Sequence, residues 1–234
     1  EDYRIMICGA IFDADGTILD SMGIWEDIAP NYIRSLGKDP DPNLTEILFK
    51  LSLNEAAEYF IEHYDIKKAC HEVVTELVCM VYDAYRDDVQ LKPGVFRLLC
   101  YLHSQNIPIA VATSSDRRYL EAAFKRLNIM QFFDGIYTTS EYQTNKMSPD
   151  IYIKASETFG CRREDIFVFE DACHAAKTAH DAGFKVIGVY DDSAKKHTEE
   201  IKQISDLYIE SFEDLDLNIF DKAYVLPEFH RDYA

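Results

Sequence analysis

The sequence lacks a long apolar run and a surplus of basic residues, and each absence excludes a class of protein. No apolar stretch approaches the ~18 residues of a membrane-spanning helix, so no transmembrane segment is expected. The 24 lysines and arginines are outnumbered by 42 aspartates and glutamates, which gives a formal charge of −18. Neither nucleic acid nor an anionic membrane is an expected partner, because both require a basic face.

Paired cysteines are also missing. None of the six stands in the Cys-x-x-Cys spacing that is typical of zinc sites. Most have apolar neighbours, so we expect buried free thiols and a reducing, cytoplasmic environment. The first residues, Glu-Asp-Tyr-Arg, do not resemble a signal peptide. The cysteines are Cys8, Cys70, Cys79, Cys100, Cys161 and Cys173.

What the sequence does have is an α/β pattern that a block of helices interrupts. Residues 5–12 form an apolar run that is typical of a buried parallel strand. From residue 20 to 90, apolar residues recur at helical spacing with no strand between them. From residue 91 onward helices and strands alternate, which predicts a Rossmann-like, doubly wound parallel sheet. We therefore expect a discontinuous core domain (1–19 and 91–234) with an inserted helical-bundle cap (20–90).

The helical block carries its own start and stop signals. Asp20 or Ser21 can cap its first helix, and Gly37 can end it. Asn54 is typical of the N-cap of a later helix. Trp25 falls on the apolar stripe of the first helix, which favours a place in the core of the bundle.

Polar residues follow four of the predicted strands. Taken singly, such residues are turn formers, helix caps or, for the lysine, a solvated surface residue. In a parallel sheet, however, these strand ends meet at one edge, where open α/β sheets bind ligands. The residues are Asp13 and Asp15 after the first strand, Thr113 and Ser114 after the second, Lys146 in the loop after the third, and Glu170 and Asp171 after the fourth.

Brought together, these groups suit a phosphate ester and a divalent cation. Carboxylates favour Mg²⁺, which offsets the charge between a phosphate dianion and an attacking carboxylate. A threonine hydroxyl, a backbone amide and a lysine can bind the phosphoryl oxygens. The expected metal ligands are Asp13, Glu170 and Asp171, and the expected phosphate ligands are Thr113, Ser114 and Lys146.

The two aspartates after the first strand are expected to have different roles. Asp13 is the expected nucleophile, which forms an aspartyl-phosphate. Asp15 is the expected acid and base, which protonates the leaving oxygen and then activates water. The sequence therefore predicts a Mg²⁺-dependent phosphomonoesterase that acts on a small phosphorylated metabolite.

Four segments, in this order, resemble the motifs of the haloacid dehalogenase superfamily, in its helical-cap phosphatase and β-phosphoglucomutase-like branch. They are Phe-Asp-Ala-Asp-Gly-Thr (12–17), Val-Ala-Thr-Ser-Ser (111–115), Lys-Met-Ser-Pro-Asp (146–150) and Phe-Glu-Asp (169–171). Met147 departs from the proline that is usual in the third motif. The resemblance extends from Ile5 to about Ile209.

The resemblance implies roles residue by residue. Asp13 is similar to the family's phospho-accepting nucleophile. Asp15 is similar to its acid/base, which also offers a backbone carbonyl to Mg²⁺. Asp15 argues against dehalogenation, since the dehalogenase branch lacks this second aspartate. The remaining matches are Thr113 and Lys146 at the phosphate-binding positions and Glu170 and Asp171 at the metal-binding pair.

Two other functions remain open. Phosphosugar mutases of the β-phosphoglucomutase type usually carry a histidine where Trp25 stands and an arginine where Leu53 follows Ser52. A non-enzymatic phospho-accepting receiver domain uses a similar set of groups, but it is about half this length and lacks the helical insertion. Whatever the reaction, four cap residues are candidates for contacting the non-reacting end of the substrate: Trp25, Lys50, Ser52 and Asn54.

The insertion also predicts a cap that closes over the site, with hinges near residues 20–23 and 87–93. Cys173 and His174, just after the fourth motif, are interpreted as bystanders at the start of a helix. We expect a monomer or a weak homodimer.

Overall fold

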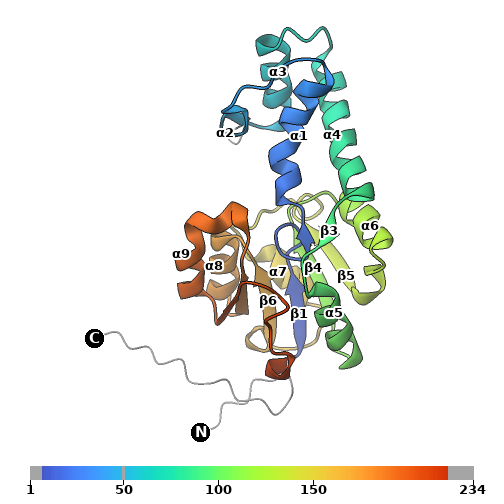
Figure 1. Ribbon diagram of the computed structural model, residues 1–234. Helices are drawn as coiled ribbons and strands as arrows, with labels where there is room; N and C mark the ends of the chain where they lie inside the picture. The colour runs from blue at the N-terminus through green and yellow to red at the C-terminus, as the bar shows by residue number, and fades with distance from the viewer. Residues whose placement is uncertain (1–6, 49–50, 221–234) are drawn as a thin grey trace, which may run out of the picture.

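The computed structural model describes residues 7–48 and 51–220, and it consists of a sheet with flanking helices and a helical projection at one end (Figure 1). Residues 5 and 6 of the predicted first strand and the cap candidate Lys50 lie outside the described residues. Within the described ranges, no helix combines the length and the apolar composition that crossing a bilayer requires.

The predicted doubly wound sheet is confirmed. Six parallel strands have the order β5-β4-β1-β6-β7-β8, so β1 lies between β4 and β6 and the chain order reverses at β1. Such a reversal is where open α/β sheets bind ligands. The strands are β1 (Gly9–Phe12), β4 (Ile109–Thr113), β5 (Gly135–Thr138), β6 (Ile166–Glu170), β7 (Lys185–Val189) and β8 (Leu207–Ile209).

Helices cover both faces of this sheet, which explains why its central strands are apolar on both sides. One face packs on α5 (Val95–Ser104) and α6 (Arg117–Arg126), where Phe12 and Phe169 stack with ring centroids 4.2 Å apart. The other face, which includes Ile11, packs on α7 (Asp150–Ser156), α8 (Cys173–Asp181) and α9 (Thr198–Ile204).

The helical block forms a third apolar cluster, around Tyr32, Ile33, Phe60 and Val73. A short antiparallel ribbon, β2 (Leu19–Asp20) with β3 (Gln90–Leu91), joins it to the sheet domain. These features support the division into cap and core that the sequence suggests, and we retain that division as a proposal. The helices of the block are α1 (Met22–Ser35), α2 (Leu44–Leu48), α3 (Leu53–His63) and α4 (Cys70–Asp87).

The last turns of α4 pack against the sheet domain. Val81 and Tyr85 are buried in the same cluster as Leu120 of α6. In addition, Arg126 of α6 donates hydrogen bonds to the backbone carbonyls of Tyr85 and Val89. Helix α4 thus joins the cluster of the helical block to the core cluster that contains Leu120, and its C-terminal end is fixed to the latter.

One of the predicted helix caps is wrong, and another has the predicted position but no capping bond. The N-cap of α3 is Ser52, not Asn54, because the Ser52 amide donates to Glu55 (2.7 Å) and the Glu55 amide returns a bond to the Ser52 hydroxyl. Ser21 stands at the N-cap position of α1 but makes no capping bond with its side chain. Gly37, with φ +73°, follows α1 as predicted.

The prediction of buried free thiols is wrong for Cys8 and Cys161, which form a disulfide. Pairing of β1 with β6 brings their flanks together, and the Cys8 amide donates to the Asp165 carbonyl at 2.7 Å. The two cysteines are 153 residues apart in the sequence, so their spacing gave no signal. The other four are free, but none is fully buried: Cys79 is exposed, and Cys70, Cys100 and Cys173 are partly buried.

Candidate active site

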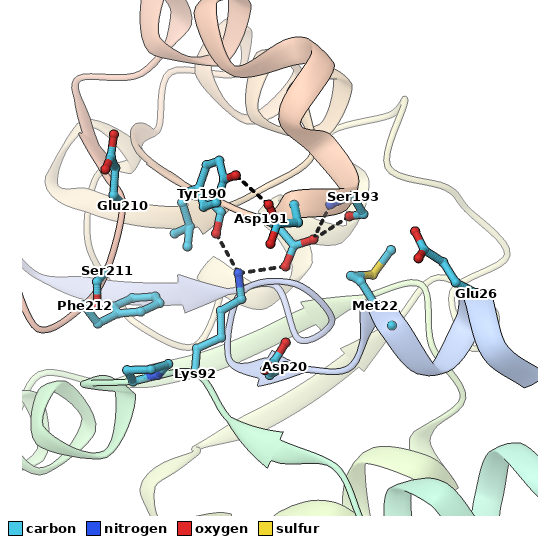
Figure 2. Close-up of a pocket in the computed structure, with 14 residues that line it drawn as sticks. Asp20, Met22, Glu26, Lys92, Tyr190, Asp191, Ser193, Glu210, Ser211 and Phe212 are labelled. Carbon is cyan, nitrogen blue, oxygen red and sulfur yellow. Dashed lines mark hydrogen bonds and ion pairs between the residues drawn. The ribbon is translucent and has the colours of Figure 1, made fainter.

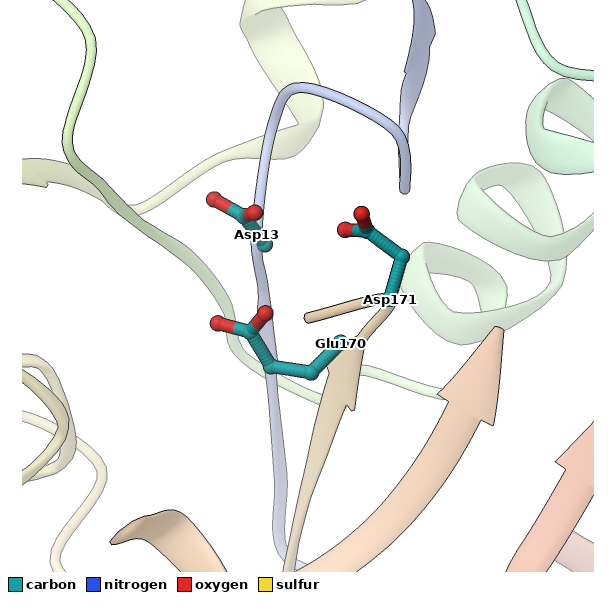
Figure 3. Close-up of side chains that lie close together, drawn as sticks. All are labelled: Asp13, Glu170 and Asp171. Carbon is teal, nitrogen blue, oxygen red and sulfur yellow. The ribbon is translucent and has the colours of Figure 1, made fainter. Parts of the chain in front are cut away.

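Three carboxylates converge at the reversal point of the sheet. Asp13 directly follows β1, Glu170 ends β6, and Asp171 comes next (Figure 3). The Asp13 amide donates to the Phe169 carbonyl at 2.9 Å, which aligns the two strand ends. One carboxylate oxygen from each residue lies within 4.8 Å of the others. The convergence that the sequence predicts for these three residues is therefore present.

Lys146 lies inside this cluster and not at the surface. Its Nζ is 2.5 Å from Asp13 Oδ1 and 2.5 Å from Glu170 Oε1. Burial acts to lower the pKa of Lys146, but the charges of these two carboxylates outweigh it and raise the pKa above its usual value. The ammonium group therefore stays charged. Tyr152 adds a hydrogen bond of 2.6 Å to the same Glu170 oxygen.

The three carboxyl groups hold their protons more tightly than exposed carboxyls do. Burial raises the pKa of Asp13 to about 7, and the nearby Asp171 contributes while Lys146 opposes. Burial likewise raises the pKa values of Glu170 and Asp171 to about 7, in each case with a neighbouring carboxylate adding to the effect. The charge of one lysine offsets only one carboxylate, so the ionised cluster retains a surplus of negative charge.

This arrangement fits a hard divalent cation. Glu170 Oε2 is buried and has no hydrogen-bond partner, which is costly unless a ligand binds it. Carboxylate oxygens are the donors that Mg²⁺ prefers. Asp13, Glu170 and Asp171 would hold the ion, as the sequence predicts for these residues.

Gly16 and Thr17 complete the first motif and hold Asp171. Gly16 has φ +79°, and a Cβ at this position would lie 2.5 Å from Asp171 Oδ2. Only glycine therefore fits beside this carboxylate. The Thr17 hydroxyl donates to Asp171 Oδ1 at 2.9 Å.

Asp15 lies outside the metal cluster and accepts hydrogen bonds from three hydroxyl groups. Ser21, in the segment leading into the cap, donates at 2.6 Å. Tyr85 of α4 donates to the same oxygen, and Ser115, in the loop after β4, donates to the other. The sequence reasoning missed Tyr85 and Ser115 as site residues. Ser115 lies inside the second motif, but nothing in the local pattern points to Tyr85.

The two predicted phosphate ligands of β4 lie beside the cluster. Thr113 is the last residue of β4, and the pairing of Phe12 with Val111 places it next to the Asp13–Asp15 segment. Its hydroxyl accepts a hydrogen bond from the Ser115 amide at 3.0 Å. Ser114 is exposed at the same edge. Hydrogen bonds and ion pairs join Lys146 to the carboxylates. Thr113 and Ser114 lie beside the carboxylates because β4 pairs with β1.

A cavity of about 760 Å³ extends from Asp171 toward the cap. Trp25 of α1 lines it and is 41% exposed, so the prediction that Trp25 lies in the bundle core is wrong. The apolar stripe of α1 begins at Trp25, before the part of the helix that packs in the bundle core. Cys173 and His174, which stand at the start of α8 as predicted, also line the cavity. The candidates Ser52 and Asn54, both among the described residues, are not part of this wall.

A second cavity, of about 420 Å³, lies beside the ribbon formed by β2 and β3 (Figure 2). Lys92, just after β3, pairs with Asp191 at 2.8 Å and donates to the Tyr190 carbonyl at 2.6 Å. Burial acts to raise the pKa of Asp191, but hydrogen bonds from Lys92 and Ser193 keep it below its usual value. This ion pair ties the returning hinge segment to the loop after β7.

The fold and the site together define an α/β enzyme whose carboxylates and lysine gather at the switch point of the sheet beneath a helical insertion. Comparison with known proteins gives the family. The chain belongs to the haloacid dehalogenase-like hydrolases, because residues 10–189 match the family model of that description. Its relatives include several named phosphatases, and the protein is a phosphatase-type enzyme of this family.

Individual relatives are moderately similar. The chain is 27% identical over 213 residues to a probable pseudouridine-5'-phosphatase of Drosophila melanogaster, covering 86% of this chain and 92% of the relative. It is 27% identical over 210 residues to the β-phosphoglucomutase of Bacillus subtilis, covering 86% and 91%. A putative β-phosphoglucomutase from Thermotoga maritima shares the fold, with a TM-score of 0.75, 22% identity, and coverage of 91% of this chain and 96% of that one.

Proposed function

We propose that this protein is a Mg²⁺-dependent phosphomonoesterase that hydrolyses a small phosphorylated metabolite through an aspartyl-phosphate on Asp13. The observation that supports this most strongly is the buried cluster in which Lys146 bridges Asp13 and Glu170 while Glu170 Oε2 lacks a partner. A site for a cation, a fixed positive charge and a carboxylate nucleophile are what phosphoryl transfer to a carboxylate requires.

Asp13 is the nucleophile in this proposal. Lys146 occupies Asp13 Oδ1, so the second oxygen is the one that attacks phosphorus. A bond forms between that oxygen and phosphorus, while the bond from phosphorus to the ester oxygen breaks. Mg²⁺, when bound, offsets the charge between the phosphate and the carboxylate. Lys146, the Thr113 hydroxyl and the Ser114 amide bind the phosphoryl oxygens.

Asp15 moves the protons. It protonates the ester oxygen as that oxygen leaves, then accepts a proton from the water that attacks the aspartyl-phosphate. Inorganic phosphate departs, and Asp13 is restored. The three hydroxyls on Asp15 come from the segment that leads into the cap, from the core-packed end of α4 and from the loop after β4, so three distant segments position this carboxyl group.

The cap would close over the bound substrate and exclude water. Lys92 is tied to Asp191 and Arg126 is tied to the end of α4, which favours hinges narrower than residues 20–23 and 87–93. We propose that the movement occurs mainly in the segment from Asp20 to Gly23 and in the part of α4 that precedes Val81. Equal activity of forms that are cross-linked open and closed would argue against this gating.

Release of phosphate from p-nitrophenyl phosphate tests the proposal. Turnover should require Mg²⁺ and should disappear in Asp13→Asn. The exposed Asp39→Asn variant is the matched control, and its turnover should equal that of the wild type. An Asp13→Asn variant that hydrolyses the ester at the wild-type rate would overturn the assignment.

A phosphosugar mutase is the second candidate, because relatives and structural neighbours carry that name. It would convert β-glucose 1-phosphate into its isomer in the presence of a sugar bisphosphate. The absence of isomerisation, together with phosphate release, would exclude it.

A further inference from the structure

Trp25, the only tryptophan of the chain, faces a cavity and not the interior of the bundle. Its Nε1 donates to the Tyr85 hydroxyl at 3.0 Å, and the two rings meet edge to face, with centroids 6.3 Å apart. The single polar atom of the indole is therefore already bonded within the protein. The surface that Trp25 offers to a ligand is the carbon skeleton of a ring held in a fixed orientation.

Other apolar side chains share the cap side of this cavity with Trp25. Met22 and Ala29 of α1 and Leu48 of α2 line it together with Trp25. Figure 1 shows α1 and α2 standing above the side of the core that carries α8 and α9, and residues of both those helices form the facing wall. Asp171 lies at the core end, so a phosphate bound at the carboxylate cluster would extend its organic part toward the indole.

The volume suits a ligand larger than a simple sugar phosphate. At about 760 Å³ the cavity falls within the range of pockets for drug-sized molecules, about 300 to 1,000 Å³. Those hydroxyls of a sugar ring that face Met22, Ala29 or Leu48 would find no side-chain hydrogen bonds there. Buried hydroxyls without partners are costly. A flat ring with few polar groups avoids that cost and stacks favourably on an indole.

The polar residues of the cavity suit the edge of such a ring. Thr45 and Glu26 lie on the cap side, and Lys177 and Glu200 lie on the core side. Both donors and acceptors are therefore available for the carbonyl and N–H groups of a heterocycle.

We propose that this cavity binds a planar heterocyclic base against Trp25, and that the substrates of the enzyme are nucleoside 5'-monophosphates or compounds of that class. This rests on the phosphomonoesterase function proposed above. The phosphate occupies the carboxylate edge, the ribose spans the space beside Asp171, and the base packs on the indole.

Binding to the Asp13→Asn protein tests the proposal directly, because tryptophan fluorescence from this chain reports on Trp25 alone. Uridine 5'-monophosphate and ribose 5-phosphate differ at C1 of the ribose, where the nucleotide carries the base and ribose 5-phosphate carries a hydroxyl. The nucleotide should quench the emission to saturation and should bind at least about tenfold more tightly, as stacking of about 1.4 kcal/mol implies. Equal affinity for the two ligands, or binding of the nucleotide without a change in emission, would overturn the proposal.

Kinetics provide a second test that does not depend on fluorescence. In Trp25→Leu, the ratio of kcat/KM for uridine 5'-monophosphate to that for ribose 5-phosphate should fall about tenfold, and Trp25→Phe should restore most of it. Phe96→Leu is the matched control, since Phe96 is also exposed but lies on α5 outside the cavity. An unchanged ratio in Trp25→Leu would refute the base-binding role.

The two proposals fail in different ways. If p-nitrophenyl phosphate is hydrolysed in an Asp13-dependent manner while the nucleotide shows no advantage over ribose 5-phosphate, only the ring site is wrong. If no phosphate ester is hydrolysed but the nucleotide still quenches Trp25, the ring site stands and the phosphomonoesterase function is wrong.

Discussion

Replacement of Lys146 by methionine should destabilise the metal-free protein strongly, and more so at high pH. Lys146 is the buried cation that pairs with both Asp13 and Glu170 at 2.5 Å. Removing one partner of a buried ion pair costs about 3 to 5 kcal/mol, because the remaining charge stays buried without compensation. For a chain of 234 residues, where 1 kcal/mol shifts Tm by about 2 to 4 °C, the loss should be easily measured.

The sign of the pH dependence follows from the raised carboxyl pKa values. A carboxyl whose pKa is higher in the folded state contributes stability that is present below its unfolded value and lost as pH rises through its folded value. The pKa values of Asp13 and Asp171 rise from 3.8 to about 7, and that of Glu170 rises from 4.5 to about 7. The stability that these carboxyl groups contribute is therefore lost between about pH 4 and pH 7. Below this pH range the carboxyl groups are protonated, so the loss of Lys146 should lower the free energy of unfolding least there.

The assay is urea unfolding of wild type and Lys146→Met in the presence of EDTA, at pH 5 and at pH 8. The difference in unfolding free energy should be larger at pH 8. Lys154→Met is the control, because Lys154 also pairs with a glutamate at 2.5 Å but at the surface, where such pairs contribute about 0 to 1 kcal/mol. A Lys146→Met protein as stable as this control at pH 8 would refute the reasoning.

Three further predictions concern the same edge of the sheet. Mg²⁺ should raise Tm more at pH 8 than at pH 5, because the carboxyls with pKa values of about 7 must lose their protons to bind it; equal shifts in calorimetry would contradict this. Gly16→Ala should weaken Mg²⁺ binding in titration calorimetry, since its Cβ would lie 2.5 Å from Asp171 Oδ2 at φ +79°; unaltered affinity would be unexpected. Tyr85→Phe removes a hydrogen bond to Asp15 and should lower kcat about tenfold and shift the pH profile; a change in KM alone would point to a role in binding only.

The sequence predicted the sheet and most of the cluster because both follow from local rules. An apolar run makes a buried strand, and the ends of parallel strands share an edge. Asp13, Glu170 and Asp171 each directly follow or end such a run, so their convergence required only the strand order. The prediction of Lys146 depended on its convergence with the other strand ends, since a lysine in a loop is ordinarily solvated.

What the sequence did not predict depends on packing between distant segments. The disulfide requires the flanks of β1 and β6 to meet. The hydroxyls on Asp15 come from positions 21, 85 and 115, which only the tertiary fold brings together. Trp25 lies on a helical stripe as the periodicity indicates, but periodicity does not show where the neighbouring helices end and a cavity begins.

The most direct test of the proposed function is to identify the residue that carries the phosphoryl group. The enzyme is mixed rapidly with substrate and Mg²⁺, quenched in acid, digested, and analysed by peptide mass spectrometry. We predict a phosphorylated peptide that contains Asp13, labile at alkaline pH and absent from Asp13→Asn. Steady hydrolysis with the phosphoryl group on another residue, or with none trapped on Asp13 when its breakdown is slowed in Asp15→Asn, would contradict the account.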